Sequence, residues 1–300
     1  MRHARLERHA PGPPAAPPVQ PRLALVIGSG GVRGVAAIGV AEVLAREGLR
    51  PELIVGCSSG ALFGAPIALG MPSRDALAAA TSYWSADLTR QKRWRAFAQL
   101  LAPRWFGFDA GFALRDDGRI AHVVEAAFAG LKIEDLPTPL RIAATDAASG
   151  APVVLTRGSL PLALRASMAV PFLFPSIEFE GRRLVDGVIS DPLPMAAASD
   201  AQVIVTLGFQ GAMPRRIDRA SRMVAQVSTA LINNLQQARQ AAARAAGQRV
   251  LHLELGLERH VGLWETEAMP YLFEAGRRAA LAQLPHIAAL FGTPLRRRVA

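Results

Sequence analysis

The stretch Gly56-Cys57-Ser58-Ser59-Gly60 directly follows the apolar run Leu53-Ile54-Val55 and decides how this chain is interpreted. A serine between small residues after a strand is typical of a sharp strand-to-helix turn, because small neighbours let the backbone adopt a strained conformation. Such a turn exposes the hydroxyl oxygen to a substrate carbonyl. The pattern therefore predicts that Ser58 is a nucleophile at the end of a buried strand.

A second glycine-rich loop, Gly28 to Gly34, follows another short apolar strand, residues 23–27, and leads into a predicted helix over residues 35–47. Consecutive glycines before a helix leave backbone N–H groups uncovered and directed at one point. That arrangement suits either a developing oxyanion or a phosphate. The loop alone leaves both chemistries open.

A nucleotide site fits this loop poorly. Arg33 occupies the third glycine position of the Gly-x-Gly-x-x-Gly spacing counted from Gly28. A dinucleotide-binding fold also places an acidic residue at the end of its second strand, where this chain has the Ser58 turn. A Walker-type loop is disfavoured further, because no Gly-Lys-Ser/Thr follows. Dinucleotide and ATP-type cofactors are therefore not expected.

A serine nucleophile needs a base that takes its proton, and the sequence offers histidines and one aspartate for this role. In an α/β-hydrolase several strands precede the nucleophile and a histidine follows it, whereas only about two strands fit before residue 58. His252, His260 and His286 carry no neighbouring signature. Asp186 is a stronger candidate, because it ends a short predicted strand and precedes a flexible glycine. An ordinary Asp-Gly turn is the alternative interpretation.

Together these pieces resemble the patatin-like phospholipase family in its bacterial form. That family combines a glycine-rich oxyanion loop ending in Arg/Lys-Gly, a Gly-x-Ser-x-Gly turn about 30 residues later, and a downstream Asp-Gly. The segment 165–175 is similar to the family's stretch between the turn and the aspartate, and Pro192-Leu193-Pro194 resembles the stretch after it. The resemblance covers about residues 23–210.

The resemblance implies a role for each matching residue. Ser58 would be the nucleophile and Asp186 the base, with no histidine, metal or organic cofactor. The amides of Gly30 and Gly31 would form the oxyanion hole, and Arg33 would brace the loop or contact a lipid phosphate. Two positions depart from the pattern: Val188 replaces the usual Gly or Ala, and Asp191 stands where Asn is common. A bulkier Val188 would crowd the loop and narrow the substrate range.

Composition indicates a globular chain. The 300 residues are 51% hydrophobic and 19% charged, and no apolar run is long enough to span a membrane. Residues 1–22 contain six prolines and no apolar signal region, so we expect a disordered leader followed by a single domain, 23–300. The one cysteine, Cys57, fits a small buried residue better than a nucleophile. A cytoplasmic location is expected.

The net charge of +10 is carried almost wholly by arginine. No nucleic-acid motif accompanies it, so the expected partners are a lipid substrate and an anionic membrane surface. Residues 83–108 interleave Trp84, Trp94 and Trp105 with basic side chains, as membrane-surface segments do. The alternative is a helical insertion whose aromatic side chains pack on the core. Peripheral contact with the inner face of the membrane is the corresponding hypothesis on location.

The remaining pattern predicts strands at 140–145, 152–155, 203–207 and 251–255, and a helix over residues 219–246. In that helix Val224, Val227, Leu231 and Leu235 recur at helical spacing, which predicts a face buried in the core. Strands that alternate with helices indicate an α/β fold with a mostly parallel central sheet flanked by helices on both faces. Residues 296–298, all arginine, are expected to form a solvated tail.

The sequence therefore predicts a serine acyl hydrolase that cleaves lipid acyl esters, either phospholipid or lysophospholipid, through Ser58 and Asp186. Two alternatives remain open. One is an α/β-hydrolase-type esterase that uses a histidine-containing triad. The other is a weakly active, lipid-binding regulatory protein, for which Val188 is the only support in the sequence.

Overall fold

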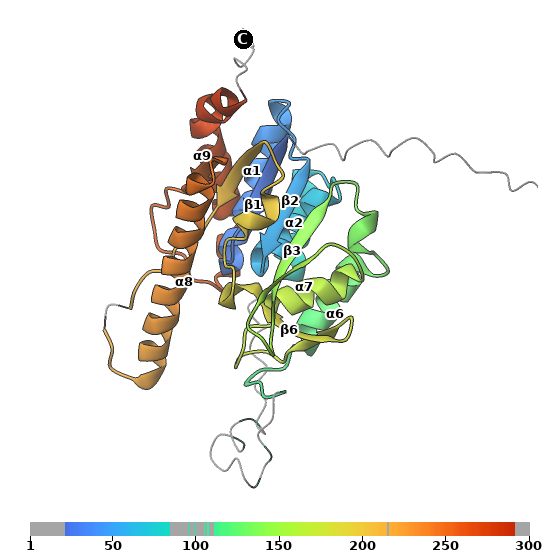
Figure 1. Cartoon of the computed structure of the whole chain (residues 1–300), viewed down its shortest axis with the longest axis vertical. Helices are drawn as coiled ribbons and strands as arrows, with labels where there is room; N and C mark the ends of the chain where they lie inside the picture. Colours follow the sequence, from blue (N-terminus) through green and yellow to red (C-terminus); the bar gives the residue numbers. More distant parts are fainter. Residues whose placement is uncertain are drawn as a thin grey trace, which may run out of the picture.

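A single sheet of eight strands organises the part of the chain that the computed structural model describes, residues 22–84, 96, 99, 105, 107, 111–214 and 216–291 (Figure 1). The strand order is β5-β6-β3-β2-β1-β7-β8, and β4 also pairs with β3. The strands are β1 (Leu23–Ile27), β2 (Leu53–Cys57), β3 (Leu140–Asp146), β4 (Pro152–Leu155), β5 (Ile177–Phe179), β6 (Arg182–Asp186), β7 (Val203–Leu207) and β8 (Arg249–Leu253).

The centre of the sheet is parallel. Strands β3, β2, β1, β7 and β8 pair in parallel, whereas β4 and β6 run antiparallel to β3, and β5 runs antiparallel to β6. Every residue of β1, β2 and β7 is buried, which fits their almost entirely apolar sequences, because a central parallel strand is covered on both faces. The predicted mostly parallel sheet is confirmed.

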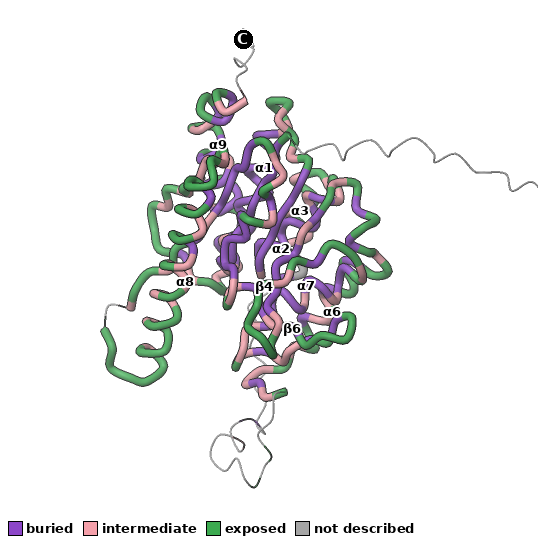
Figure 2. Tube along the Cα trace, viewed as in Figure 1, coloured by how far each residue is buried: buried purple, intermediate pink, exposed green. Residues whose placement is uncertain are grey.

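Helices cover both faces of this sheet (Figures 1 and 2). Leu25 and Ile27 of β1 belong to a large core with residues of α1, α2, α7 and α9. Ala24 and Val26 point to a smaller cluster that includes Met195 of the 3-10 turn η5 (Met195–Ala198) and Ala243 of α8. The helices are α1 (Ala36–Arg46), α2 (Ser59–Ala68), α3 (Ser73–Tyr83), α6 (Gly118–Phe128), α7 (Leu160–Met168), α8 (Ala220–Ala245) and α9 (Met269–Leu290).

One prediction about these elements is wrong. Helix α8 forms close to its expected bounds, but Val224, Val227 and Leu231 are exposed instead of lying in the core, and Leu235 is only half-buried. The reason is that α8 contacts the rest of the protein through the polar side chains of its opposite face. A smaller difference is that β8 begins two residues earlier than predicted.

Several sequence predictions fall outside the described residues. These are the leader, apart from Arg22, the arginine tail at 296–298, and most of the tryptophan- and arginine-rich segment 83–108. Of that segment's tryptophans, Trp84 is buried and Trp105 is exposed, and Trp94 is not described. In the described part of the chain, no helix has both the length and the apolar character needed to cross a membrane.

Candidate active site

Ser58 lies at the junction of β2 and α2 in a conformation that non-glycine residues rarely adopt, with φ 57° and ψ −124°. The flanking glycines make this turn sterically possible. A Cβ atom at Gly56 would lie 2.4 Å from the Cα of Ala61, and one at Gly60 would lie 2.2 Å from the carbonyl oxygen of Ile27. Glycine is therefore required at both positions, because the backbone passes close to another backbone segment at each of them.

The sheet brings Asp186 to Ser58 across 128 residues of sequence. Strand β4 occupies one edge of β3 over residues 142–145, so β2 and β6 share the other edge. On that edge Cys57, the last residue of β2, pairs with Ala143, and Asp186, the last residue of β6, pairs with the next residue, Ala144. The ends of β2 and β6 therefore meet beside adjacent residues of β3, which brings Ser58 and Asp186 within reach of each other. The hydroxyl of Ser58 donates a hydrogen bond of 2.8 Å to Oδ2 of Asp186.

Asp186 is fully buried, and burial raises the pKa of its carboxyl group to about 7. Two hydrogen bonds act in the opposite direction and lower this pKa, one from the backbone N–H of Val188 to Oδ1 (2.8 Å) and one from the hydroxyl of Ser58. Its backbone carbonyl also accepts a hydrogen bond from the hydroxyl of Thr145. A carboxyl group with a pKa near neutrality is suited to accept and return a proton.

Ser167, which no sequence pattern singles out, holds the turn at Ser58 through a hydrogen bond. The backbone N–H of Ser58 donates to Oγ of Ser167 over 2.8 Å, and that hydroxyl donates to the carbonyl oxygen of Ala143 over 2.6 Å. Ser167 is completely buried on α7. Its serine lies inside the segment 165–175 that matched the family, but no local pattern shows that it contacts residue 58.

The glycine-rich loop lies beside this turn. The N–H of Gly30 donates a long hydrogen bond of 3.2 Å to the hydroxyl of Ser59, and the N–H of Val32 is bonded to Leu263. The N–H of Gly31 has no hydrogen-bond partner among the described residues. Gly31 has a φ of +60°, and a Cβ there would lie 2.3 Å from the carbonyl oxygen of Leu263. Of the two predicted oxyanion donors, Gly31 has no hydrogen-bond acceptor among the described residues, and Gly30 makes one long hydrogen bond.

Arg33 contacts the backbone of the loops around it. Its Nε donates to the carbonyl oxygen of Gly30 (3.1 Å), its guanidinium donates to the carbonyl oxygen of Gln210 (2.9 Å), and the guanidinium lies 5.6 Å from the ring centre of Phe209. Burial lowers the pKa of Arg33. These contacts favour the role of bracing the loop over contact with a lipid phosphate.

The three candidate histidines take no part in the hydrogen bond between Ser58 and Asp186. His252 is on β8, where Nδ1 is 3.3 Å from the hydroxyl of Thr206, while His260 and His286 are exposed. None of the three is hydrogen-bonded to Ser58 in the described structure. Cys57 is buried, and burial together with Asp186 and Asp191 raises its thiol pKa well above the usual range, which keeps it neutral.

A second buried carboxylate lies close to the first. Burial raises the pKa of Asp191 to about 6, against the opposing effect of Arg239, whose Nε donates to Asp191 over 3.1 Å. Arg239 of α8 also donates to the carbonyl oxygen of Ser190 (3.0 Å). The structure thus shows a contact for each residue that departs from the family pattern. Asp191 forms an ion pair with Arg239, and the backbone N–H of Val188 donates to Asp186.

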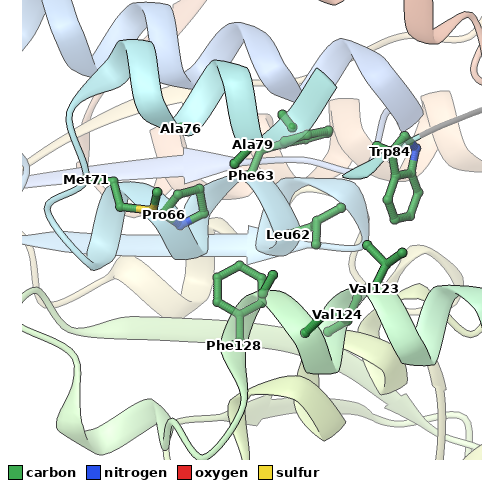
Figure 3. Close-up of a pocket in the computed structure, with 13 residues that line it drawn as sticks. Leu62, Phe63, Pro66, Met71, Ala76, Ala79, Trp84, Val123, Val124 and Phe128 are labelled. Atoms are coloured by element: carbon green, nitrogen blue, oxygen red, sulfur yellow. The ribbon is translucent and has the colours of Figure 1, made fainter. Parts of the chain in front are cut away.

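An apolar cavity of about 290 Å³ lies between α2, α3 and α6 (Figure 3). Leu62, in its wall, follows Ser58 by one helical turn, and Trp84 lies at the end of α3. The lining side chains are almost entirely apolar: Leu62, Phe63, Pro66, Met71, Ala76, Ala79, Ala80, Trp84, Val123, Val124, Ala126, Ala127 and Phe128. Such a lining fits a hydrocarbon chain, because the indole N–H of Trp84 is the one polar side-chain group among the described lining residues.

Comparison with known sequences identifies the family. The sequence model described as "Patatin-like phospholipase" matches residues 25–199. An uncharacterized NTE family protein of Mycobacterium tuberculosis is 38% identical over 200 residues, which cover 65% of this chain and 52% of that protein. Patatin-like phospholipase domain-containing protein 7 of Rattus norvegicus is 30% identical over 190 residues, or 62% of this chain and 13% of that protein.

The chain spans about half the length of the mycobacterial protein, and a smaller part of the rat protein. Among solved structures, VipD from Legionella pneumophila matches with a TM-score of 0.47 and 12% identity, over 90% of this chain and 67% of that one. The type III effector ExoU matches with a TM-score of 0.34 and 14% identity, over 90% of this chain and 54% of that one.

Proposed function

The chain belongs to the patatin-like phospholipase family, and on this premise we propose that it is a serine acyl hydrolase acting on a lipid acyl ester, a phospholipid or lysophospholipid. One observation carries the proposal: the hydroxyl of Ser58 donates a 2.8 Å hydrogen bond to a buried carboxylate, Asp186. That geometry matches what nucleophilic catalysis requires, a hydroxyl in contact with a base that can take its proton.

In the proposed first step, Oγ of Ser58 attacks the acyl carbonyl carbon while its proton passes to Oδ2 of Asp186. The carbonyl C=O bond opens to a tetrahedral oxyanion. When the oxyanion collapses, the bond to the alcohol of the lipid breaks, and Asp186 returns the proton to that alcohol oxygen. Ser58 is left as an acyl ester. Water then attacks this ester while one of its protons passes to Asp186. The bond between the acyl carbon and Oγ of Ser58 breaks, Asp186 returns the proton to Oγ, and the fatty acid is released.

The oxyanion is bound by the glycine-rich loop in this proposal. Gly31 offers an N–H that is bonded to no acceptor in the described part of the chain. Gly30 can offer a second, because its bond to the neutral Ser59 hydroxyl is long and an oxyanion is a stronger acceptor. Loss of one such donor from a preorganised site typically costs about 3 to 4 kcal/mol of transition-state stabilisation.

Substitution of the two reacting residues tests the proposal. Ser58→Ala is expected to abolish hydrolysis of a p-nitrophenyl acyl ester and labelling by a fluorophosphonate probe, whereas Ser228→Ala, at an exposed serine of α8, should retain both. Asp186→Asn should lower kcat by orders of magnitude. Persistent labelling of the Ser58→Ala protein, or an equal loss on replacing His252, would overturn the assignment.

The pH dependence gives an independent test. Asp186 accepts a proton only as the carboxylate, and its pKa is raised to about 7. We therefore expect kcat/KM to fall about tenfold per pH unit below that pKa and to level off above it. A profile that is flat down to about pH 5 would show that the base titrates like an exposed carboxylate, in disagreement with the buried site.

We propose further that the apolar cavity beside α2 holds the acyl chain, since Leu62 in its wall is one helical turn from Ser58. Ala80→Phe, which narrows the cavity, should reduce kcat/KM for a long-chain ester about tenfold and spare a short-chain ester. Ala78→Phe is the matched control, because Ala78 lies on the same helix, is exposed and does not line the cavity. Equal effects of both variants would reject this assignment.

A further inference from the structure

Helix α8 is attached to the body of the protein by its polar face. The amide of Asn233 forms two hydrogen bonds with the backbone of Gly211, accepting from its N–H (2.8 Å) and donating to its carbonyl oxygen (2.9 Å). Further along the same face, Gln236 is buried and donates to the carbonyl oxygen of Phe209, and Arg239 binds Asp191. These contacts fix which side of the helix faces inward.

The opposite side of α8 is apolar and faces water. Met223, Val224, Val227 and Leu231 are 57%, 64%, 54% and 64% exposed. At 100° per residue these four positions fall within a sector of about 100°, so they form a continuous stripe along one face. Figure 2 shows the N-terminal half of α8 as mostly exposed. The usual amphipathic arrangement is reversed in this half of the helix.

The stripe extends past the end of the sheet that carries the active site. Gly211 lies four residues beyond Leu207, the last residue of β7, and β7 runs parallel to β1 and β2, whose following loops form the candidate active site. Because Asn233 is bonded to Gly211, the 13 residues of α8 that precede Asn233 extend beyond this end by up to about 20 Å. The projection is visible in Figure 1.

Other exposed apolar side chains occur close to the candidate active site. Ile189 is 52% exposed and follows Asp186 by three residues, and Phe172 is 65% exposed, three residues after Ala169, whose carbonyl oxygen accepts the N–H of Asp186. Met213 and Ile217, in the segment that leads from β7 into α8, are also exposed. The active-site end therefore presents apolar groups from several separate segments.

The charge in the sequence around the stripe is predominantly positive. Between residues 215 and 244 the sequence has six arginines and a single acidic residue, Asp218, and no acidic residue occurs from 219 to 253. Arg216 and Arg219 are exposed just before the helix begins. Arg219 and Arg222 also form ion pairs with Asp218, which leaves an excess of positive charge near the start of the helix. An apolar helix face with an excess of nearby arginines is a composition that binds at the interface of an anionic bilayer.

We propose that the N-terminal half of α8, with its stripe Met223, Val224, Val227 and Leu231, docks the protein on an anionic lipid bilayer and so presents the active-site end to its substrate. This builds on the proposed lipid hydrolase activity. A second copy of the chain fits less well, because a symmetric contact through this helix sets two arginine-rich, acid-poor surfaces against each other, whereas anionic headgroups neutralise them.

Vesicle sedimentation tests the docking without turnover. The full-length chain carrying Ser58→Ala should sediment with phosphatidylcholine vesicles that contain phosphatidylglycerol, and salt should weaken the binding. Adding Val224→Gln and Leu231→Gln should weaken it about tenfold or more, because two aliphatic side chains no longer enter the bilayer. Leu281→Gln is the matched control, since Leu281 of α9 is 51% exposed and lies outside the stripe.

The outcomes separate the two proposals. Unchanged binding of the double variant, or an equal loss for Leu281→Gln, overturns the docking assignment. So does a parent chain that is dimeric by light scattering and becomes monomeric in the double variant without loss of vesicle binding, because the stripe is then a contact between copies. If the parent chain, with Ser58 in place, binds vesicles but hydrolyses no ester, the result supports docking and rejects only the proposed hydrolase activity.

Discussion

Two regions at the same end of the sheet depart in opposite ways from the rule that polar side chains are exposed and apolar side chains are buried. At the candidate active site a carboxyl group, Asp186, is fully buried with no cation bonded to it in the described structure. On α8 a stripe of aliphatic side chains faces water. The buried carboxyl group finds its hydrogen-bond partners within the chain, because Ser58 donates to Oδ2 and the N–H of Val188 donates to Oδ1. The stripe is left uncovered by the described chain.

The difference shows what an apolar pattern encodes. Helix α9, which is similar in length to α8, buries its apolar side against α1, where a Cβ on Gly276 would lie 2.1 Å from the carbonyl oxygen of Ala36. Both helices have an apolar face at helical spacing, and among the described elements only that of α9 is covered by a partner. Periodicity predicts which face is apolar, and the contacts of the opposite face decide whether it is covered.

The largest expected effect comes from one leucine replacement made on each helix. Leu272→Ala on α9 should lower the free energy of unfolding by about 2 to 5 kcal/mol, because Leu272 is completely buried and leaves a cavity. Leu231→Ala on α8 should change it by less than about 0.5 kcal/mol, because its side chain is already in water. Denaturant unfolding measures both. A comparable loss for Leu231→Ala would show that the stripe is covered.

The next effect concerns the buried carboxyl group. In the folded chain the pKa of Asp186 is about 7, against about 3.9 when unfolded, so between these values only the folded state holds the proton. Stability contributed by this group is therefore present at low pH and lost as the pH rises towards 7. Asp186→Asn removes this dependence.

We expect Asp186→Asn to gain about 2 to 3 kcal/mol of relative stability between about pH 5 and pH 8, while activity is lost. Parallel urea titrations of parent and variant across this range measure the change. A difference in unfolding free energy between the two proteins that does not vary with pH would show that burial does not raise the pKa of Asp186. The contrast between a buried carboxyl group and an exposed apolar stripe would then be rejected for the carboxyl group.

A smaller effect is expected where α8 is anchored. Asn233→Ala leaves the N–H and the carbonyl of Gly211 without their partner, which should cost about 1 to 2 kcal/mol. Asn234→Ala is the matched control, because Asn234 is the exposed neighbour of Asn233. Hydrogen exchange should show faster exchange in the N-terminal half of α8 for Asn233→Ala alone. Equal protection in the two variants would show that another contact holds the helix.

The smallest expected effect concerns Val188, the residue that supports the alternative of a weakly active, lipid-binding protein. Val188 supports Asp186 through its backbone N–H, and this bond does not depend on the side chain. Val188→Ala, which restores a residue usual in the family, should therefore change kcat/KM on a short-chain ester by less than about threefold. A large gain in activity would instead support a weakly active, lipid-binding protein.

Much of the fold could be predicted from local sequence. The strands over residues 23–27, 152–155 and 203–207 have the predicted bounds, because an unbroken apolar run or a strand between turns is a local signal. Motifs also predict that Ser58 and Asp186 belong to one site, and the register of β3 explains why the two residues meet.

Contacts between distant segments could not be predicted in the same way. Ser167 supports Ser58 only because α7 packs against the end of β3, and Arg239 reaches Asp191 only because α8 lies across η5. The incorrect core face of α8 has the same origin: Val224 and Leu231 repeat at helical spacing whether or not a partner covers them. The sequence carries the pattern of each element, and these contacts depend on where the elements dock.

The central place of β1 in the sheet has a consequence during biosynthesis. One edge of β1 pairs with β2, which follows closely, but the other pairs with β7, whose last residue is 180 positions after Ile27 (207 − 27). At about 5 to 20 residues per second, a ribosome needs about 10 to 35 s to make that stretch. For that time the emerging chain has an apolar strand edge open to pairing with other chains, which is the kind of segment that ribosome-associated chaperones shield.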